Sequence, residues 1–392
     1  MAVITDLQHT EIGVIPSDWQ VRPIKSIAER IMVGIASAAT HAYRPRGVVM
    51  FRNQNIKPGY LSDEDVLFIE EAFELSFKNK RLKGGDLLTA RTGYPGTTAV
   101  VPDRYDGAQS FTTLITRPLG RFVNSDYLCF YINSAAGRKF FEQNQIGGGQ
   151  KNVNAGSLRE LLVVLPPKAE QQAIATALSD ADAYIESLEQ LITKKRQIKQ
   201  GVMQELLTGK RRLPGFEGEW ERRNLGDVCS ITTGRKDVNE GHPQGVYPFF
   251  TCSRSHTFSN SFSFDMEAIL IAGNGDVGNL HYFHGKFEAY QRTYVAYDFK
   301  INTQFMWHQL NYLLAKSLGL GKVGSSIPYI KRENLTQFSF PCPATIVEQV
   351  GIASVLTDLD YDISSHEGML VKARYLKQAM MQQLLTGKIR LV

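Results

Sequence analysis

The sequence has few of the residues and patterns that mark several classes of protein. Its 392 residues include only four cysteines, which are Cys129, Cys229, Cys252 and Cys342, and it has no Cys-x-x-Cys pair. Cysteines scattered in this way predict neither a zinc site nor a disulfide framework. No apolar run is long enough to span a bilayer, and the first residues lack the basic-then-apolar layout of a secretory signal. We therefore expect a cytoplasmic protein with no membrane partner.

Motifs for nucleotide binding and catalysis are also scarce. The stretch GNGDVG, Gly273–Gly278, has the spacing of a dinucleotide-binding loop, but the residues after it are aromatic and typical of a strand, not a helix. The stretch GLGKVGSS resembles a phosphate loop but has Val323 where serine or threonine must follow the lysine. The sequence also has no Asn-Pro-Pro-aromatic tetrapeptide of an amino-methyltransferase. A tight turn at 273–278 is therefore favoured, and a dinucleotide-binding enzyme stays as an alternative.

The net charge of the chain does not show whether it binds nucleic acid. The formal net charge is +5 and the pI is near 8.8. A mild positive charge permits binding to a polyanion such as DNA, but many proteins of this size are equally basic.

The main feature that is present is a repeat. The segment EQQAIATALSDADAYIESLEQLITKKRQIKQGVMQELLTGKRRL begins at Glu170, and EQVGIASVLTDLDYDISSHEGMLVKARYLKQAMMQQLLTGKIRL begins 178 residues later, at Glu348. About half of the paired positions are identical. Neither copy contains proline, and both are rich in helix-forming residues. Each copy therefore predicts a long helix.

The spacing of apolar residues indicates how these two helices pack. In both copies apolar residues recur at steps of three and four, which is the pattern of a coiled-coil seam. The seam runs through Ile174, Leu178, Ala181, Ile185, Leu188 and Ile192, then Lys195, Lys199, Val202 and Leu206; in the second copy it runs through Ile352, Leu356, Leu359, Ile363, His366, Leu370, Ala373, Lys377, Met380 and Leu384. We expect the two helices to form an antiparallel coiled coil.

The segments before each helix repeat as well. Trp19 corresponds to Trp220, Gly93 to Gly275 and Gly96 to Gly278, with little similarity between these anchors. Alternating apolar runs predict strands, and helices are expected near residues 125–143 and 302–317. The predicted fold is α+β: two mixed α/β domains and two long helices, related by a pseudo-two-fold internal repeat. The expected boundaries are 1–167 for the first domain, 168–208 for the central helix, 209–343 for the second domain and 344–392 for the last helix.

This doubled arrangement, in which a globular region is followed by EQ, a long helix and LLTGK, resembles the specificity subunit of type I restriction–modification systems, HsdS. The resemblance implies a non-catalytic, DNA-binding subunit. Each target-recognition domain would read one half of a bipartite, asymmetric site in double-stranded DNA, and the helix pair would fix the spacer and dock two modification (methyltransferase) subunits. ATP-dependent restriction subunits would join the complex. S-adenosylmethionine, ATP and Mg would be held by the partners, with no cofactor or metal in this chain. A coiled-coil scaffold with protein-binding modules is the alternative.

Three loop regions recur at equivalent places in both halves and carry residues suited to reading bases or binding phosphates. Arginine pairs with guanine, asparagine and glutamine with adenine, and lysine and serine with phosphate. The first region contains Arg52, Asn53, Asn55 and Lys57, against Ser253, Arg254 and His256; the second contains Arg91, Thr92 and Tyr94, against Asn274 and Asp276; the third contains Gln150, Lys151 and Asn152, against Lys322, Ser325 and Ser326. These residues form the predicted DNA-binding surface.

Overall fold

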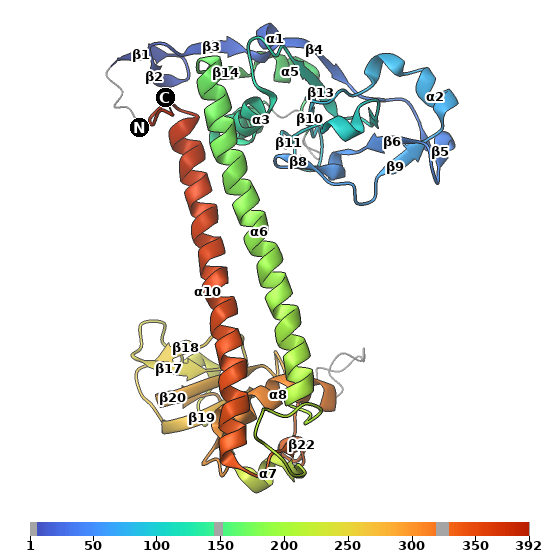
Figure 1. Ribbon diagram of the computed structural model, residues 1–392. Helices are drawn as coiled ribbons and strands as arrows, with labels where there is room; N and C mark the ends of the chain where they lie inside the picture. Colours follow the sequence, from blue (N-terminus) through green and yellow to red (C-terminus); the bar gives the residue numbers. More distant parts are fainter. Residues whose placement is uncertain (1–5, 145–151, 319–328, 392) are drawn as a thin grey trace. The chain divides into compact units, whose positions relative to one another are not determined.

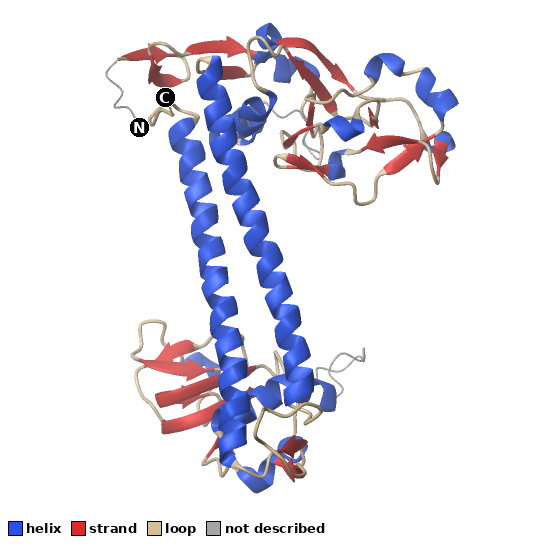
Figure 2. Ribbon diagram, viewed as in Figure 1, coloured by secondary structure: helices blue, strands red, loops and turns tan. Residues whose placement is uncertain are grey.

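The computed structural model describes residues 6–144, 152–318 and 329–391, and the chain divides into two compact units. The first unit comprises residues 1–187 and 369–392, and the second comprises residues 188–368. Each unit is a mixed domain of helices and strands together with part of each long helix (Figures 1 and 2).

The two repeated segments form the two long helices, as predicted. Helix α6 spans Lys168–Leu206 and helix α10 spans Ile346–Leu384, each with 39 residues (green and red in Figure 1). In the first unit, Lys377 of α10 forms an ion pair with Asp182 of α6. In the second, Lys195 and Lys199 of α6 pair with Asp362 and Asp360 of α10, respectively. Later residues of α6 thus meet earlier residues of α10, so the helix segments run antiparallel.

The first unit contains several small sheets. A four-stranded antiparallel sheet has the order β11-β10-β13-β4, a second sheet has the order β12-β6-β9-β5, and β14 pairs with β3. The strands are β1 (Leu7–Thr10), β2 (Gly13–Pro16), β3 (Gln20–Pro23), β4 (Ala28–Val33), β5 (Tyr43–Arg44), β6 (Val48–Phe51), β7 (Ile56–Lys57), β8 (Tyr60–Leu61), β9 (Leu67–Ile69), β10 (Leu87–Thr89), β11 (Thr98–Val100), β12 (Gln109–Ser110), β13 (Leu114–Pro118) and β14 (Leu162–Leu165). The helices before α6 are α1 (Ile24–Ile27), α2 (Glu71–Leu75), α3 (Ser125–Asn133), α4 (Ala135–Gln143) and α5 (Ala155–Glu160).

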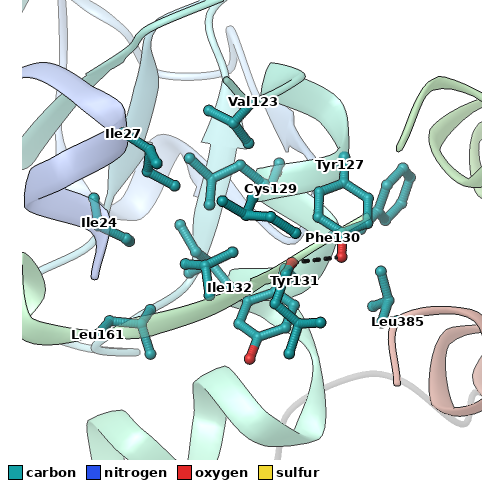
Figure 3. Close-up of a cluster of buried hydrophobic side chains, with 14 of the residues drawn as sticks. Ile24, Ile27, Val123, Tyr127, Cys129, Phe130, Tyr131, Ile132, Leu161 and Leu385 are labelled. Carbon is teal, nitrogen blue, oxygen red and sulfur yellow. Dashed lines mark hydrogen bonds between the residues drawn. The ribbon is translucent and has the colours of Figure 1, made fainter. Parts of the chain in front are cut away.

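The core of the first unit joins the domain to the end of α10. Residues of α3 are almost fully buried because they pack against β14, the start of α6 and the residues after α10. Figure 3 shows Tyr127 and Phe130 of α3 in the same cluster as Leu385. The Tyr127 hydroxyl donates a hydrogen bond of 2.8 Å to the carbonyl oxygen of Val164. The core therefore includes residues from both ends of the described chain.

The second unit repeats this plan with a larger sheet. Its six strands have the order β16-β21-β19-β20-β17-β18, and β15 pairs with β22 as β3 pairs with β14. The strands are β15 (Glu221–Asn224), β16 (Ser230–Thr233), β17 (Tyr247–Phe250), β18 (Thr257–Ser259), β19 (Phe264–Ala272), β20 (Leu280–Ala289), β21 (Thr293–Tyr297) and β22 (Ser339–Cys342). The shorter helices are α7 (Leu225–Val228), α8 (Thr303–Ser317) and α9 (Arg332–Thr336). The helix predicted near 302–317 is confirmed, whereas the one predicted near 125–143 is two helices separated by Ser134, whose backbone is extended.

The repeated phrase LLTGK ends each long helix with a glycine in the left-handed region. Gly209 has φ of +73° and Gly387 has φ of +72°, a conformation that residues with a Cβ atom rarely adopt. An indole ring also covers each glycine, Trp220 beside Gly209 and Trp19 beside Gly387. The phrase therefore occurs twice because the same helix end, a left-handed glycine beside a tryptophan, occurs in each unit.

Candidate DNA interface

The first two predicted loop regions of the first unit lie together, and the residue that follows the third region is bonded to them. Asn53 Oδ1 accepts a hydrogen bond of 2.7 Å from the backbone N–H of Arg91, which joins the first region to the second. Val153 N–H donates to the carbonyl oxygen of Arg91 at 3.1 Å, and Arg91 Nε donates to the carbonyl oxygen of Val153 at 3.3 Å. These bonds join the second region to Val153, the residue that follows the third region, so segments distant in sequence are held together.

Within the first region, the predicted residues differ in their exposure. Asn55 is buried, its Oδ1 accepts from the backbone N–H of Arg52 and its Nδ2 donates to the carbonyl oxygen of Glu64. The structure thus gives Asn55 a role in holding the loop, which corrects its prediction as a base-reading residue. Arg52 is half-buried and its guanidinium donates to the carbonyl oxygen of Asp65, whereas Lys57 is exposed.

The second region is a turn between β10 and β11. Gly93 and Gly96 have φ values of +77° and +92°, and a Cβ atom on Gly96 would lie 2.3 Å from the Phe141 ring. At the tip of the turn, Tyr94 is 85% exposed. Thr92 is half-buried beside it. The two glycines thus present an exposed aromatic ring next to Arg91.

Part of the third region is not described. Gln150 and Lys151, like Lys322, Ser325 and Ser326 of the second half, lie outside the described residues. Asn152 is half-buried, and its Oδ1 is shielded from solvent without a hydrogen-bond partner among the described residues.

The loops of the second unit converge in the same manner. The carbonyl oxygen of Ser253 accepts hydrogen bonds from Asn279 Nδ2 at 2.9 Å and His281 Nε2 at 3.1 Å. Arg254 forms an ion pair with Asp276 on the turn between β19 and β20. The ring of His256 contacts the rings of Phe250 and Phe258. The first and second regions of this half are therefore in contact.

The end of the third region is held at the same place in both halves. Ile330 N–H donates to the carbonyl oxygen of Gly273 at 2.9 Å, as Val153 N–H donates to Arg91. Asn274, which follows Gly273, is half-buried. The scaffold of the loop surface is therefore repeated, whereas the side chains that it presents differ.

The turn at GNGDVG does not have the form of a dinucleotide-binding loop. It connects two antiparallel strands, with Ile271 of β19 opposite Leu280 of β20, so no helix begins at the turn to receive a phosphate. The tight turn favoured by the sequence is confirmed. The stretch that resembles a phosphate loop falls on residues 319–326, outside the described residues.

All four cysteines are buried, and three of them have a raised pKa. Burial raises the pKa of Cys129 and of Cys229 to about 12, and that of Cys342 to about 11. The three thiols are thus protonated at neutral pH, a form that is a poor nucleophile and metal ligand. Among the described residues, no group of three or more histidine, cysteine, aspartate or glutamate side chains could hold a metal ion.

Each long helix carries a second candidate surface. On α6, Tyr184 is exposed in the first unit, and Leu191 and Ile198, seven residues apart, are exposed in the second unit. Exposed apolar residues also lie on α10, namely Tyr361, Met369, Tyr375 and Leu376. No helix of the described chain is apolar over enough of its length to span a bilayer. These side chains are suited to contact with another protein.

Ion pairs join the long helices, and the spacing of apolar residues does not predict them. The apolar spacing places Lys195, Lys199 and Lys377 on the seam but does not identify their aspartate partners. The repeat carries a usable signal, because Asp182 and Lys199 recur as Asp360 and Lys377. An antiparallel register pairs each aspartate with the lysine of the other copy.

Comparison with known protein families gives matches in both halves of the chain. Residues 16–200 and 217–372 match the family described as the type I restriction modification DNA specificity domain. The chain is 36% identical to the type I restriction enzyme EcoDI specificity subunit of Escherichia coli over 168 residues, which are 43% of this chain and 37% of that protein. It is 25% identical to the putative type I restriction enzyme MjaX specificity subunit of Methanocaldococcus jannaschii over an alignment that covers 98% of this chain and 97% of that protein.

Solved structures share the fold. The S subunit of a type I restriction–modification system from M. genitalium superposes with a TM-score of 0.66 at 16% identity, covering 98% of this chain and 99% of that one. A chain from a structure that describes complex assembly of the type I R-M system gives a TM-score of 0.59 at 16% identity, covering 96% and 99%. These similarities confirm the predicted fold class of two mixed domains and two long, paired helices.

Proposed function

The chain belongs to the family of type I restriction–modification DNA specificity domains, and from this premise we propose that each of its two domains reads one half of a bipartite, asymmetric site in double-stranded DNA. The observation that carries the proposal is the convergence of loops at one place in each unit. The hydrogen bonds of Val153 to Arg91 and of Ile330 to Gly273 hold the same framework, while the exposed residues on it differ. Two related scaffolds with different side chains suit two different half-sites.

The long helices would set the distance between the half-sites. Each is an uninterrupted helix of 39 residues, which corresponds to about 58 Å at 1.5 Å per residue. The ion pairs of Asp182 with Lys377 and of Asp360 with Lys199 keep the two helices in register within their units. A helix pair of fixed length and register is suited to act as the spacer.

The exposed apolar residues of the helices would dock two modification subunits. Leu191 and Ile198, both in the second unit, lie seven residues apart on α6, which is the heptad spacing at which a helix of another protein can pack. The chain itself would be a non-catalytic subunit. S-adenosylmethionine for methylation, and ATP and Mg for restriction subunits, would be held by these partners in the cytoplasm.

Binding and methylation by the assembled complex test this proposal. The chain, purified with its modification subunits, is mixed with a randomised DNA library, and the bound and methylated sequences are determined. We expect a two-part consensus with a spacer of fixed length. Arg91→Ala should weaken binding to the first half-site by about 1–3 kcal/mol without affecting the other. Gln150→Ala should act in the same way, whereas Lys25→Ala, which removes an exposed ion pair with Glu160, serves as the control.

The main alternative, a scaffold that binds only proteins, makes the opposite prediction. In that case the modification subunits would bind the chain, but no DNA sequence would be enriched. Failure of Arg91→Ala and Gln150→Ala to change affinity for the selected site would remove their loops from the DNA surface.

A further inference from the structure

Arg254 of the second unit has an unusual ion pair. Its Nε donates a hydrogen bond of 2.8 Å to Asp276 Oδ2 on the neighbouring turn. The arginine side chain is 88% exposed and the aspartate side chain 42% exposed. Because the carboxylate takes Nε, it leaves the two terminal nitrogens, Nη1 and Nη2, without a hydrogen-bond partner among the described residues.

Two arginines, Arg117 and Arg212, differ from Arg254 because they use a terminal nitrogen within the protein. Arg117 binds Asp86 through both Nε and Nη2, and Arg212 binds Glu348 in the same way. In these pairs Nε and Nη2 of the guanidinium both bind a carboxylate of the same chain. In Arg254 the outer edge of the guanidinium faces solvent.

The backbone that carries Arg254 is held firmly in place. The loop carbonyls of Cys252 and Ser253 accept hydrogen bonds from the N–H of Asp276 at 3.3 Å, from Asn279 Nδ2 at 2.9 Å and from His281 Nε2 at 3.1 Å. Gly275, with φ of +66°, gives the turn its shape. The loop that carries the arginine and the turn that carries the aspartate therefore form one cross-linked platform.

Stability does not explain this pair, because an ion pair between largely exposed side chains contributes little to folding. Its physical effect is to restrict the rotation of a long, flexible side chain. The two free N–H donors then project in parallel, which is the geometry that pairs with O6 and N7 of guanine in the major groove. A carboxylate beside the guanidinium also disfavours a phosphate contact, since both groups are anionic.

We infer that Arg254 reads a guanine in the half-site bound by the second domain, and that Asp276 is the positioning residue for its guanidinium. The inference rests on the proposed function. Arg91 in the first unit has a related arrangement, because its Nε donates to the carbonyl oxygen of Val153. An arginine held through its Nε thus lies in the first loop region of the second domain and in the second loop region of the first domain.

The test compares variants of the full chain in complex with its modification subunits. Sequences bound from a randomised DNA library are determined for the wild type, Arg254→Lys, Arg254→Ala and Asp276→Asn. Arg254→Lys keeps the charge but loses the two-pronged donor, so we expect it to reduce preference for guanine at one position of one half-site. The expected loss is roughly 5- to 140-fold, the equivalent of about 1–3 kcal/mol at 1.4 kcal/mol per tenfold. Asp276→Asn should weaken the preference at the same position to a smaller extent.

Two further measurements separate base reading from other roles. Replacing the guanine by 7-deazaguanine removes the N7 acceptor, so it should weaken the wild type and leave Arg254→Ala unchanged. Arg223→Lys, which alters an exposed ion pair with Glu221 on β15, is the matched control and should keep every base preference. Thermal unfolding checks that each variant folds.

The outcomes distinguish this inference from the proposed function. If the wild type selects a bipartite site but Arg254→Lys keeps every base preference, or lowers affinity equally for all sequences, the inference is wrong and the proposed function stands. If Asp276→Asn leaves the guanine preference intact while Arg254→Lys abolishes it, Asp276 is not the positioning residue. If the wild type selects no sequence, the proposed function itself fails.

Discussion

Arg390 binds Glu170 through two hydrogen bonds of 2.7 Å, from Nε to Oε1 and from Nη2 to Oε2. The corresponding pair in the second unit is Arg212 with Glu348. In both pairs the arginine follows the end of one long helix and the glutamate lies at the start of the other. The glutamate of each EQ phrase thus pairs with the arginine two residues after the LLTGK of the other copy, so each unit takes one partner from each repeat.

We predict that Arg390→Ala strongly destabilises the protein. The Glu170 side chain is 1% exposed, so removing its partner leaves a buried carboxylate with only the Trp19 indole N–H, at 3.1 Å, as a donor among the described residues. Breaking a buried pair in this way costs about 3–5 kcal/mol. Urea unfolding measures the loss, and adding Glu170→Gln to Arg390→Ala should recover part of it. The control Lys25→Ala breaks an exposed pair and should cost at most about 1 kcal/mol. Equal costs for the two single variants would contradict the assignment.

A second prediction concerns the glycines that end the helices. Gly387→Ala places a Cβ atom 2.4 Å from Pro16 in a left-handed conformation, whereas Gly209→Ala meets Trp220 at 3.2 Å. Both changes should destabilise, by at least about 1 kcal/mol, and Gly387→Ala by more. Gly201→Ala, within α6 and five residues before its end, meets nothing within 4 Å and should stabilise by roughly 0.5–1 kcal/mol. Thermal unfolding should give the lowest melting temperature for Gly387→Ala, then Gly209→Ala, and the highest for Gly201→Ala. A different order would refute this account.

The helical part of the fold could be predicted well because it depends on local patterns. Ile174, Leu178 and Ile352 lie on the predicted seam and are buried. The helix propensity and the apolar spacing of these segments agree, and no distant residue is needed to recognise them. The ion-pair partner of Lys199, in contrast, cannot be recognised from local sequence, because it depends on the register between two antiparallel helices.

The candidate DNA surface could be predicted only as regions. The sequence indicates three loop regions by their equivalent positions in the two halves, and the structure shows that a hydrogen bond from Arg91 N–H to Asn53 Oδ1 joins the first two in the first unit. It could not distinguish Asn55, whose amide is used inside its loop, from Arg254, whose outer donors are free. Residue type gives the chemistry of a side chain, but the turns around it decide which way it faces.

A third prediction concerns the dependence of stability on pH. His308 of α8 is 2% exposed and its imidazole lies beside the hydroxyl of Thr357, and burial lowers its pKa from about 6.5 to about 4. The unfolded chain therefore takes up this proton at a higher pH than the folded chain does. The contribution of neutral His308 to the free energy of unfolding should be fully present above pH 6.5. It should fall by roughly 3 kcal/mol as the pH drops toward 4.

His308→Phe tests this account, because Phe130 occupies the equivalent position in the first unit. Urea unfolding between pH 7.5 and 4.5 should show a shallower loss of stability in the variant than in the wild type. Thr357→Val, which removes the hydroxyl and keeps the histidine, should retain the wild-type slope. Parallel curves for the wild type and His308→Phe would show that another group is responsible.

The last prediction concerns the length of the helices. Four residues inserted into α6 after Ser187, with four more inserted into α10 after Gly368, lie at the junctions between the two units and leave the helix pairing within each unit unchanged. Four residues add about 6 Å and close to one helical turn. That length corresponds to about two base pairs at 3.4 Å each. We therefore expect the DNA spacer to lengthen by about two base pairs while both half-site sequences stay the same, as measured by mapping methylated sites. The half-site sequences should not change because the loops that read them lie outside the long helices. Altered half-sites with an unaltered spacer would show that the helices do not act as the spacer.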